Sequence, residues 1–149
     1  MQLSSYSDYS LRMLMQLALA PRRRHTIREI AGAFNISHNH LTKIAQELGR
    51  QGYIETFRGR GGGLSLTRPP EQILIGEVVR RTEGNLALVE CFDPAADQCV
   101  ISEACRLKFA LASALEAFFR VLDGYTLSDL LQDRGRLEAI LGGPDGRGR

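Results

Sequence analysis

Long hydrophobic runs are missing from this 149-residue chain, although 44% of its residues are hydrophobic. No apolar stretch approaches the roughly 20 residues of a membrane span, so we expect no membrane-embedded segment. The first ten residues contain neither a basic region nor an apolar one, and no secretory signal is evident. We therefore expect a cytoplasmic protein with one domain, or two small and closely associated ones.

The patterns that mark common enzyme sites are also missing. No catalytic triad, paired carboxylate pocket or substrate loop is visible, and the chain has no internal repeats. The glycine-rich stretch at 59–63 is not followed by Gly-Lys-Ser/Thr and leads into a strand-like segment, which argues against a phosphate-binding loop. We therefore expect a protein that is not an enzyme.

Cysteine is scarce, and all three cysteines lie in one polar segment, CFDPAADQCVISEAC, at Cys91, Cys99 and Cys105. Soft thiolates select zinc, copper(I) or iron–sulfur clusters. Such centres usually take four ligands, so a fourth would come from another residue, a second subunit or an exogenous molecule. The Cys-x-x-Cys pair typical of zinc sites is absent. A disulfide with one cysteine left over, a direct thiol switch, and three merely half-buried small residues are the alternatives.

Charge is unevenly distributed along the chain. Residues 1–70 contain ten Lys and Arg against four Asp and Glu, a balance of +6, whereas residues 71–149 contain nine against thirteen, a balance of −4. A basic N-terminal half favours a polyanionic partner. The alternative is a solvated basic face without a partner.

Helical periodicity predicts a helix over residues 5–19 and two further helices separated by a tight turn. Thr26 and Glu29 form a capping-box pair that opens the second helix, and Asn35 can adopt the left-handed conformation that ends it. Ser37 is expected to cap the third helix, which runs to about residue 51. A helix–turn–helix of this size is used to read DNA.

The outward face of the third helix supplies candidate DNA contacts. Side chains near the start of a recognition helix reach base edges. We therefore predict base contacts for His38, Asn39, His40 and Thr42, and a phosphate contact for Lys43. A plain solvated helix face is the alternative reading.

A predicted β-hairpin follows the third helix directly. Strand-like segments at 53–57 and 64–66 flank a glycine-rich turn that carries Arg58 and Arg60. This arrangement is typical of the wing of a winged helix, and places the two arginines to enter a minor groove or to clamp the DNA backbone. The sequence therefore predicts a mainly α fold with one small hairpin and a winged helix-turn-helix domain over residues 1–68.

The remainder, after a boundary at Pro69-Pro70, holds a short helix at 73–81, the cysteine segment, and a long helix at 103–122. The apolar stripe of the long helix is broader than one small domain needs, which favours a dimerisation helix. We assign residues 69–131 to the cysteine loop and this helix, and 132–149 to a C-terminal tail whose glycine-rich end is expected to be disordered.

The chain resembles the winged-helix iron–sulfur repressors, a family that includes nitric-oxide-sensitive NsrR-type and IscR-like regulators. The resemblance covers residues 1 to about 131, and its matching stretches are SDYSLR at 7–12, RGRGGGL at 58–64, IGEVVR at 75–80, CRLK at 105–108 and LDGYTL at 122–127. The last two are more similar to the NsrR type.

The resemblance implies a homodimer that binds a near-palindromic operator in double-stranded DNA and holds a 2Fe-2S or 4Fe-4S cluster. Cys91, Cys99 and Cys105 would be ligands. In NsrR-type proteins an acidic residue of the partner's first helix can be the fourth ligand, and Asp8 matches it. Pairing with Arg12, or a first-turn capping role with Ser5, is the ordinary alternative for this acid.

The function implied is repression that nitric oxide relieves by nitrosylating the cluster. In IscR-like relatives the fourth ligand is a histidine three residues after the last cysteine, a position that Lys108 occupies here. Seven residues separate Cys91 from Cys99, and some iron-responsive relatives also have a long first gap. An iron- or redox-responsive regulator of the same family is therefore the alternative.

Overall fold

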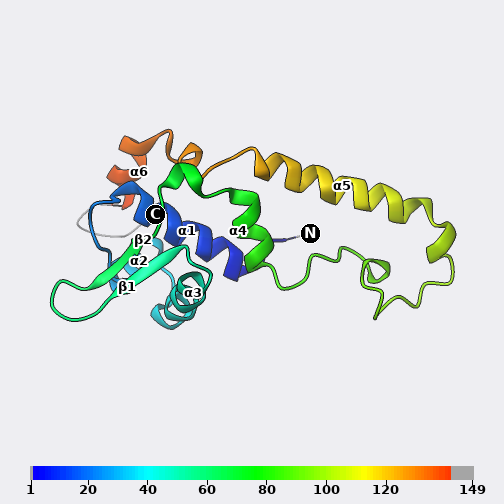
Figure 1. The fold of residues 1–149 in the computed structure, drawn as a ribbon, viewed down its shortest axis with the longest axis horizontal. Coiled ribbons are helices and arrows are strands. Elements are labelled where there is room, and N and C mark those ends of the chain that lie inside the picture. Colours follow the sequence, from blue (N-terminus) through cyan, green and yellow to red (C-terminus); the bar gives the residue numbers. More distant parts are fainter. Residues whose placement is uncertain (1, 142–149) are drawn as a thin grey trace.

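A computed structural model describes residues 2–141 and confirms a mainly helical chain with one hairpin (Figure 1). Four short 3-10 turns connect the regular elements. These elements are, in order, α1 (Ser5–Leu19), α2 (Ile27–Phe34), α3 (His38–Arg50), β1 (Ile54–Phe57), β2 (Gly63–Leu66), α4 (Ile75–Thr82), α5 (Arg106–Asp123) and α6 (Arg134–Leu141). Within the described residues, no helix combines the length and apolarity needed to cross a bilayer.

The α2–α3 unit forms largely as its sequence predicts. Thr26 accepts a hydrogen bond from the Glu29 backbone while the Glu29 carboxylate accepts one from the Thr26 backbone, so the capping box is complete. Asn35 ends α2 in the left-handed conformation at φ 52°. Ser37 is the N-cap residue of α3, as expected, although its side chain makes no capping hydrogen bond.

The wing is a two-stranded antiparallel hairpin in which β1 pairs with β2. The register places Ile54 opposite Leu66 and Phe57 opposite Gly63. Gly59 and Gly61 have φ values of 84° and 78°, which lie in the region that glycine adopts without steric cost. The Arg-Gly-Arg-Gly turn can therefore reverse the chain tightly while its arginines remain exposed.

The core of the winged helix lies between α1, α2, α3 and β2. Its most enclosed side chains include Met13, Leu14, Ile30, Leu41 and Leu48, each with no exposed surface. Full burial of such a side chain contributes about 1.5–3 kcal/mol relative to leaving it in water. This packing fixes the direction in which the polar face of α3 points.

Polar contacts join the start of α1 to the end of α4. The first helix is capped by Ser4, not by the expected pair of Ser5 and Asp8, because the Ser4 hydroxyl accepts from the Ser7 backbone. The Glu83 carboxylate accepts from the Ser4 backbone at 2.8 Å, and the buried hydroxyls of Ser7 and Thr82 lie 2.8 Å apart. The C-terminal elements are therefore tied to the winged helix.

One end of α5 is fastened to α4. Arg80 donates two hydrogen bonds to Asp123, at 2.6 and 2.7 Å, and its guanidinium lies 4.4 Å from the centre of the Phe119 ring. A side chain at Gly76 would place its Cβ 2.0 Å from an Asp123 carboxylate oxygen, so glycine permits this close approach. The backbone of Leu74 also pairs with that of Thr126.

The other end of α5 extends away from the winged helix and carries the cysteine segment (Figure 1). Its apolar residues separate into two stripes. An inner stripe of half-buried and buried residues faces the rest of the chain, and comprises Leu111, Leu115, Phe118, Phe119 and Leu122. A second stripe, which we call the outer seam, is exposed and comprises Leu107, Ala110, Ala114, Ala117 and Val121.

The outer seam has the spacing of three and four residues that one face of a helix requires. Leu107 and Val121, at its ends, are 64% and 62% exposed. The sequence predicted a single broad stripe on this helix, whereas the structure leaves one of two faces uncovered. The tail predicted from residue 132 begins with α6, and its glycine-rich part at 142–149 lies outside the described residues.

Candidate DNA-reading surface and thiol loop

The first turn of α3 presents three polar side chains to solvent. His38, Asn39 and His40 are exposed, as is Lys43 one turn later. The opposite face of α3 is buried through Leu41, Ile44, Ala45 and Leu48. The packing of this apolar face leaves the amide, imidazole and ammonium groups free to meet an external partner.

Thr42 differs from the other predicted base contacts. Its side chain is only partly exposed, and its hydroxyl donates to the backbone carbonyl of His38 at 2.9 Å. A hydroxyl that donates to a carbonyl of its own helix cannot donate the same proton to another partner. Thr42 can therefore offer an acceptor or its methyl group to a base, but not a free donor.

The wing carries Arg58 and Arg60 at its tip, and both are exposed. Within residues 2–141 neither arginine forms an ion pair. Figure 1 shows α3 and the β1–β2 turn on one side of the molecule, with α5 extending from another. The two predicted sets of DNA contacts are thus presented together.

Two residues that sequence reasoning did not assign support the wing. Arg24 lies against the hairpin, with its guanidinium 3.6 Å from the centre of the Phe57 ring. His25 is 2% exposed and exchanges backbone hydrogen bonds with Leu64. No local pattern could reveal these contacts, because they join residues 33 and 39 positions apart in the chain.

The three cysteines lie on the segment between α4 and α5, which holds only two 3-10 turns, Glu90–Phe92 and Ser102–Ala104. All three thiols are free and partly exposed. Cys91 lies in the first turn, and Cys105 is the residue that caps α5. Val100, between the last two cysteines, is 99% exposed, so little packing restrains this part of the segment.

Asp97 organises the segment around Cys99. Its carboxylate accepts from the Cys99 backbone at 3.1 Å and from the Ser102 hydroxyl at 2.5 Å, and lies 3.7 Å from the Lys108 ammonium. These contacts, with the Ser102 hydroxyl first among them, lower the pKa of Asp97. Because Lys108 belongs to α5, the carboxylate links the Cys99 turn to that helix.

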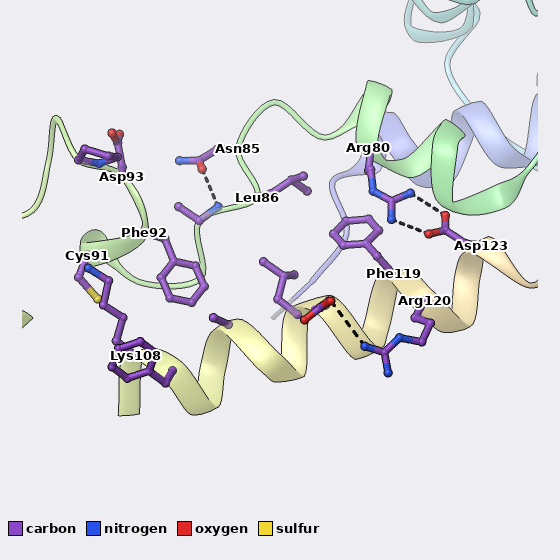
Figure 2. Close-up of a pocket in the computed structure, with 16 residues that line it drawn as sticks. Arg80, Asn85, Leu86, Cys91, Phe92, Asp93, Lys108, Phe119, Arg120 and Asp123 are labelled. Carbon is purple, nitrogen blue, oxygen red and sulfur yellow. Dashed lines mark hydrogen bonds and ion pairs between the residues drawn. The ribbon is translucent and has the colours of Figure 1, made fainter. Parts of the chain in front are cut away.

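A groove of about 1090 Å³ runs between α5 and the segment that carries Cys91 (Figure 2). Phe92, Phe109 and Phe119 supply apolar walls, and Lys108 and Arg120 supply charge. Figure 2 shows Cys91 and Lys108 at one end of this groove, and the Arg80–Asp123 pair at the other. The groove therefore spans the distance from the thiol loop to the attachment of α5.

A single chain does not gather the predicted ligands into one site. Among residues 2–141, no group of three His, Cys, Asp or Glu side chains is close enough to hold a metal ion. Three free soft donors on one weakly packed segment nevertheless suit a thiolate-bound centre chemically. The three thiols lie apart because hardly any contact with the core holds residues 91–105 in one conformation.

Asp8 lies on α1, within the winged helix, whereas the segment between α4 and α5 reaches the far end of α5 (Figure 1). Its carboxylate binds Arg12 in the i,i+4 pair expected from sequence, with distances of 2.7 and 3.0 Å. Both side chains are about two-fifths exposed, and ion pairs of this kind typically contribute about 0.3–0.5 kcal/mol. Release of Asp8 to another partner would therefore cost little.

Comparison with known proteins gives one consistent result. A family model described as Rrf2, iron-dependent transcriptional regulator, matches residues 3–133. The chain is 56% identical to the HTH-type transcriptional regulator NsrR of Geobacillus kaustophilus over 95% of this chain and 97% of that protein. For the NsrR of Bacillus subtilis the identity is 49%, with the same shares covered. The solved structure of T. potens IscR matches with a TM-score of 0.71 at 25% identity, covering 89% of this chain and 88% of that one.

Proposed function

The chain belongs to the Rrf2 family of iron-dependent transcriptional regulators, and from that premise we propose that it is a homodimeric, nitric-oxide-responsive repressor. Like these relatives, it is a DNA-binding transcriptional regulator and not an enzyme. The observation that carries the proposal is the joint presentation of the polar start of α3 and the two wing arginines. In addition, three free and partly exposed thiols lie on one segment, away from this surface.

DNA reading is assigned to two groups of residues. His38, Asn39 and His40 stand at the start of α3, where side chains of a recognition helix meet base edges in the major groove. An asparagine amide can form two hydrogen bonds with adenine, which makes Asn39 the strongest candidate for discrimination. Lys43, Arg58 and Arg60 would neutralise phosphates or enter the minor groove, and so fix register without reading sequence.

Homodimer formation is assigned to the outer seam of α5. Its three alanines allow two helices to approach closely, and its exposed Leu107 and Val121 would be covered by a second copy. A two-fold symmetric dimer places one α3 in each half-site of a near-palindromic operator. The half-site centres would then lie about 34–36 Å apart, or a multiple of that distance.

The thiols of Cys91, Cys99 and Cys105 are the proposed ligands of an iron–sulfur cluster, with Asp8 of the partner subunit completing the set. Such a cluster would supply iron, which nitric oxide binds avidly. Three thiolates and one carboxylate form an unequal set, because a carboxylate holds iron less firmly than a thiolate. The Asp8 contact would therefore be the first to open.

The chain can convey such a change through its own contacts. Cys105 caps α5, and the Asp97–Lys108 pair links the Cys99 turn to the same helix. A rearrangement of the segment would therefore act on α5, and through it on the spacing of the two α3 helices. Coupling between distant sites is typically worth 1–3 kcal/mol, or roughly 5–150-fold in affinity.

The experiment is an operator-binding titration of anaerobically purified protein, before and after stoichiometric nitric oxide, with the metal-free protein alongside. Iron and sulfide analysis establishes the cofactor independently. We expect tight binding by the loaded protein, and release on addition of nitric oxide. If binding survives nitric oxide but is lost on iron removal or exposure to oxygen, the protein is an iron- or redox-responsive regulator instead.

A further inference from the structure

Arg24 holds both sides of the wing turn. Its Nη1 donates to the carbonyl of Gly61 at 3.2 Å, and its guanidinium lies 3.6 Å from the centre of the Phe57 ring. Phe57 immediately precedes Arg58, and Gly61 immediately follows Arg60. A single side chain from the α1–α2 connection therefore contacts the residues that flank the two arginines.

The backbone beside Arg24 supports the base of the same turn. His25 donates to the carbonyl of Leu64 at 3.1 Å and accepts from its amide at 2.8 Å. Gly63 has a φ of 148°, and a Cβ there would lie 2.9 Å from the His25 carbonyl oxygen. Only a residue without a side chain allows the two segments to approach so closely.

The turn needs such support because of its composition. Residues 59 and 61–63 are all glycine, and glycine loses more conformational freedom on ordering than any other residue. An unsupported turn would point Arg58 and Arg60 in many directions, and DNA binding would have to order it. A planar guanidinium can stack on a ring and donate to a carbonyl at once, whereas a lysine ammonium cannot match this geometry.

We propose that Arg24 is a positioning residue for operator binding, which acts by orienting Arg58 and Arg60 and does not itself touch DNA. The proposal rests on the proposed function in one respect, namely that the two wing arginines contact DNA. Neighbouring arginines provide a contrast. Arg23 pairs with Glu29, and Arg22 forms no ion pair within residues 2–141.

The test is a mutant cycle in the full-length dimer, with operator affinity measured across a range of salt concentrations. The variants are Arg24→Ala, Arg24→Lys, the double variant Arg58→Ala/Arg60→Ala, and Arg24→Ala added to that double variant. Arg22→Ala is the matched control, because it removes the same charge from the same exposed connection. Thermal melting verifies that each variant is folded.

We expect Arg24→Ala to weaken binding roughly five- to tenfold, from one stacking contact and one hydrogen bond. The same change should have no further effect in the double variant, because energies of residues that act through one another are not additive. Arg24→Lys should resemble Arg24→Ala. Hydrogen exchange in the free protein should accelerate at residues 57–64 in Arg24→Ala but not in Arg22→Ala.

Additive losses in the cycle, or wild-type affinity in Arg24→Lys, would overturn the inference and make Arg24 a direct charge contact. Unchanged exchange at residues 57–64 would overturn it as well. Wild-type affinity in the double variant has a different meaning. It would show that Arg58 and Arg60 do not contribute to DNA binding. The positioning role then falls together with that part of the proposed function.

Discussion

Asp8 separates two interpretations that local sequence leaves open. The structure shows its carboxylate on Arg12, an ordinary helix-surface pair. If Asp8 also serves as a ligand in the partner's thiol site, Asp8→Ala should change the absorption spectrum or shorten the lifetime of the loaded protein. Arg12→Ala is the control, since it removes the same ion pair and leaves the carboxylate. Equal spectra for both variants and the wild type would restrict Asp8 to its helix.

His25 gives the fold a dependence on pH. Burial, aided by the charge of Arg23, lowers its pKa below the ordinary 6.5, although a hydrogen bond with the Ala20 carbonyl opposes this. The folded protein therefore binds the proton less readily than the unfolded chain. Stability should be complete above pH 6.5 and fall as the pH drops through the folded-state pKa.

Melting temperatures at pH 7.5 and 5.5 measure this effect. We expect a lower value at pH 5.5 for the wild type, and a smaller difference for His25→Phe, which cannot be protonated. The Glu29 and Glu83 carboxylates, whose pKa values are lowered from 4.5, lose their contribution only at still lower pH. His40→Gln, an exposed position on α3, should retain the wild-type difference. If His25→Phe keeps the full wild-type difference in melting temperature, another titratable group must cause the pH dependence.

At the scale of elements, α3 and the wing should differ in what they contribute to binding. Arg60→Ala should weaken binding to all DNA sequences and reduce the slope of log affinity against log salt by roughly one. Asn39→Ala should instead reduce discrimination between operator and mutated operator, by about 1–3 kcal/mol at one base pair. Competition binding with both DNAs at several salt concentrations distinguishes these outcomes. A large change in salt slope for Asn39→Ala would contradict the division.

Local sequence signals were sufficient to predict the helices and the hairpin, but not the tertiary contacts between them. The bounds of α1, the Thr26–Glu29 capping box and the wing follow from capping chemistry, periodicity and glycine placement. Ser37 is the N-cap residue of α3 without a side-chain capping bond, because its residue type allows that bond without requiring it. The contact of Arg24 with the wing and of Gly76 with Asp123 depends on tertiary packing, to which neighbouring residues give no clue.

The members of the candidate site could be proposed from the sequence and stay predictions, whereas their arrangement in space could not be proposed. The three cysteines and the polar start of α3 could be named from sequence because their residue types limit their chemistry. The distance between Asp8 and the thiols could not, because it depends on where α5 carries the loop. No three of the proposed ligands lie close together among the described residues. Because the three cysteines belong to one chain, the proposal requires residues 91–105 to rearrange around the cluster, with only Asp8 supplied by a second chain.

For the whole molecule, the outer seam of α5 predicts what should hold the dimer together. Ala114→Glu places a charge in the middle of the seam and should shift the protein to monomer and abolish tight operator binding. Ala112→Glu introduces the same side chain at an exposed position two residues away, about 200° around the helix, and should leave the dimer intact. Sedimentation analysis of both proteins checks this. A dimeric Ala114→Glu protein would place the dimer contact on another surface.

A selection for mutants that no longer respond to the signal should yield substitutions at the attachment of α5, which is formed by Gly76, Arg80 and Asp123. These residues belong neither to the DNA-reading surface nor to the proposed ligand set. At 1.5 Å per residue, the 18 residues of α5 extend about 27 Å, so a displacement of about 2 Å at the thiol end equals a rotation of about 4° at the attachment. A loosened attachment would absorb that rotation. The resulting alleles would keep their target genes permanently silent, with cofactor and operator affinity both unimpaired.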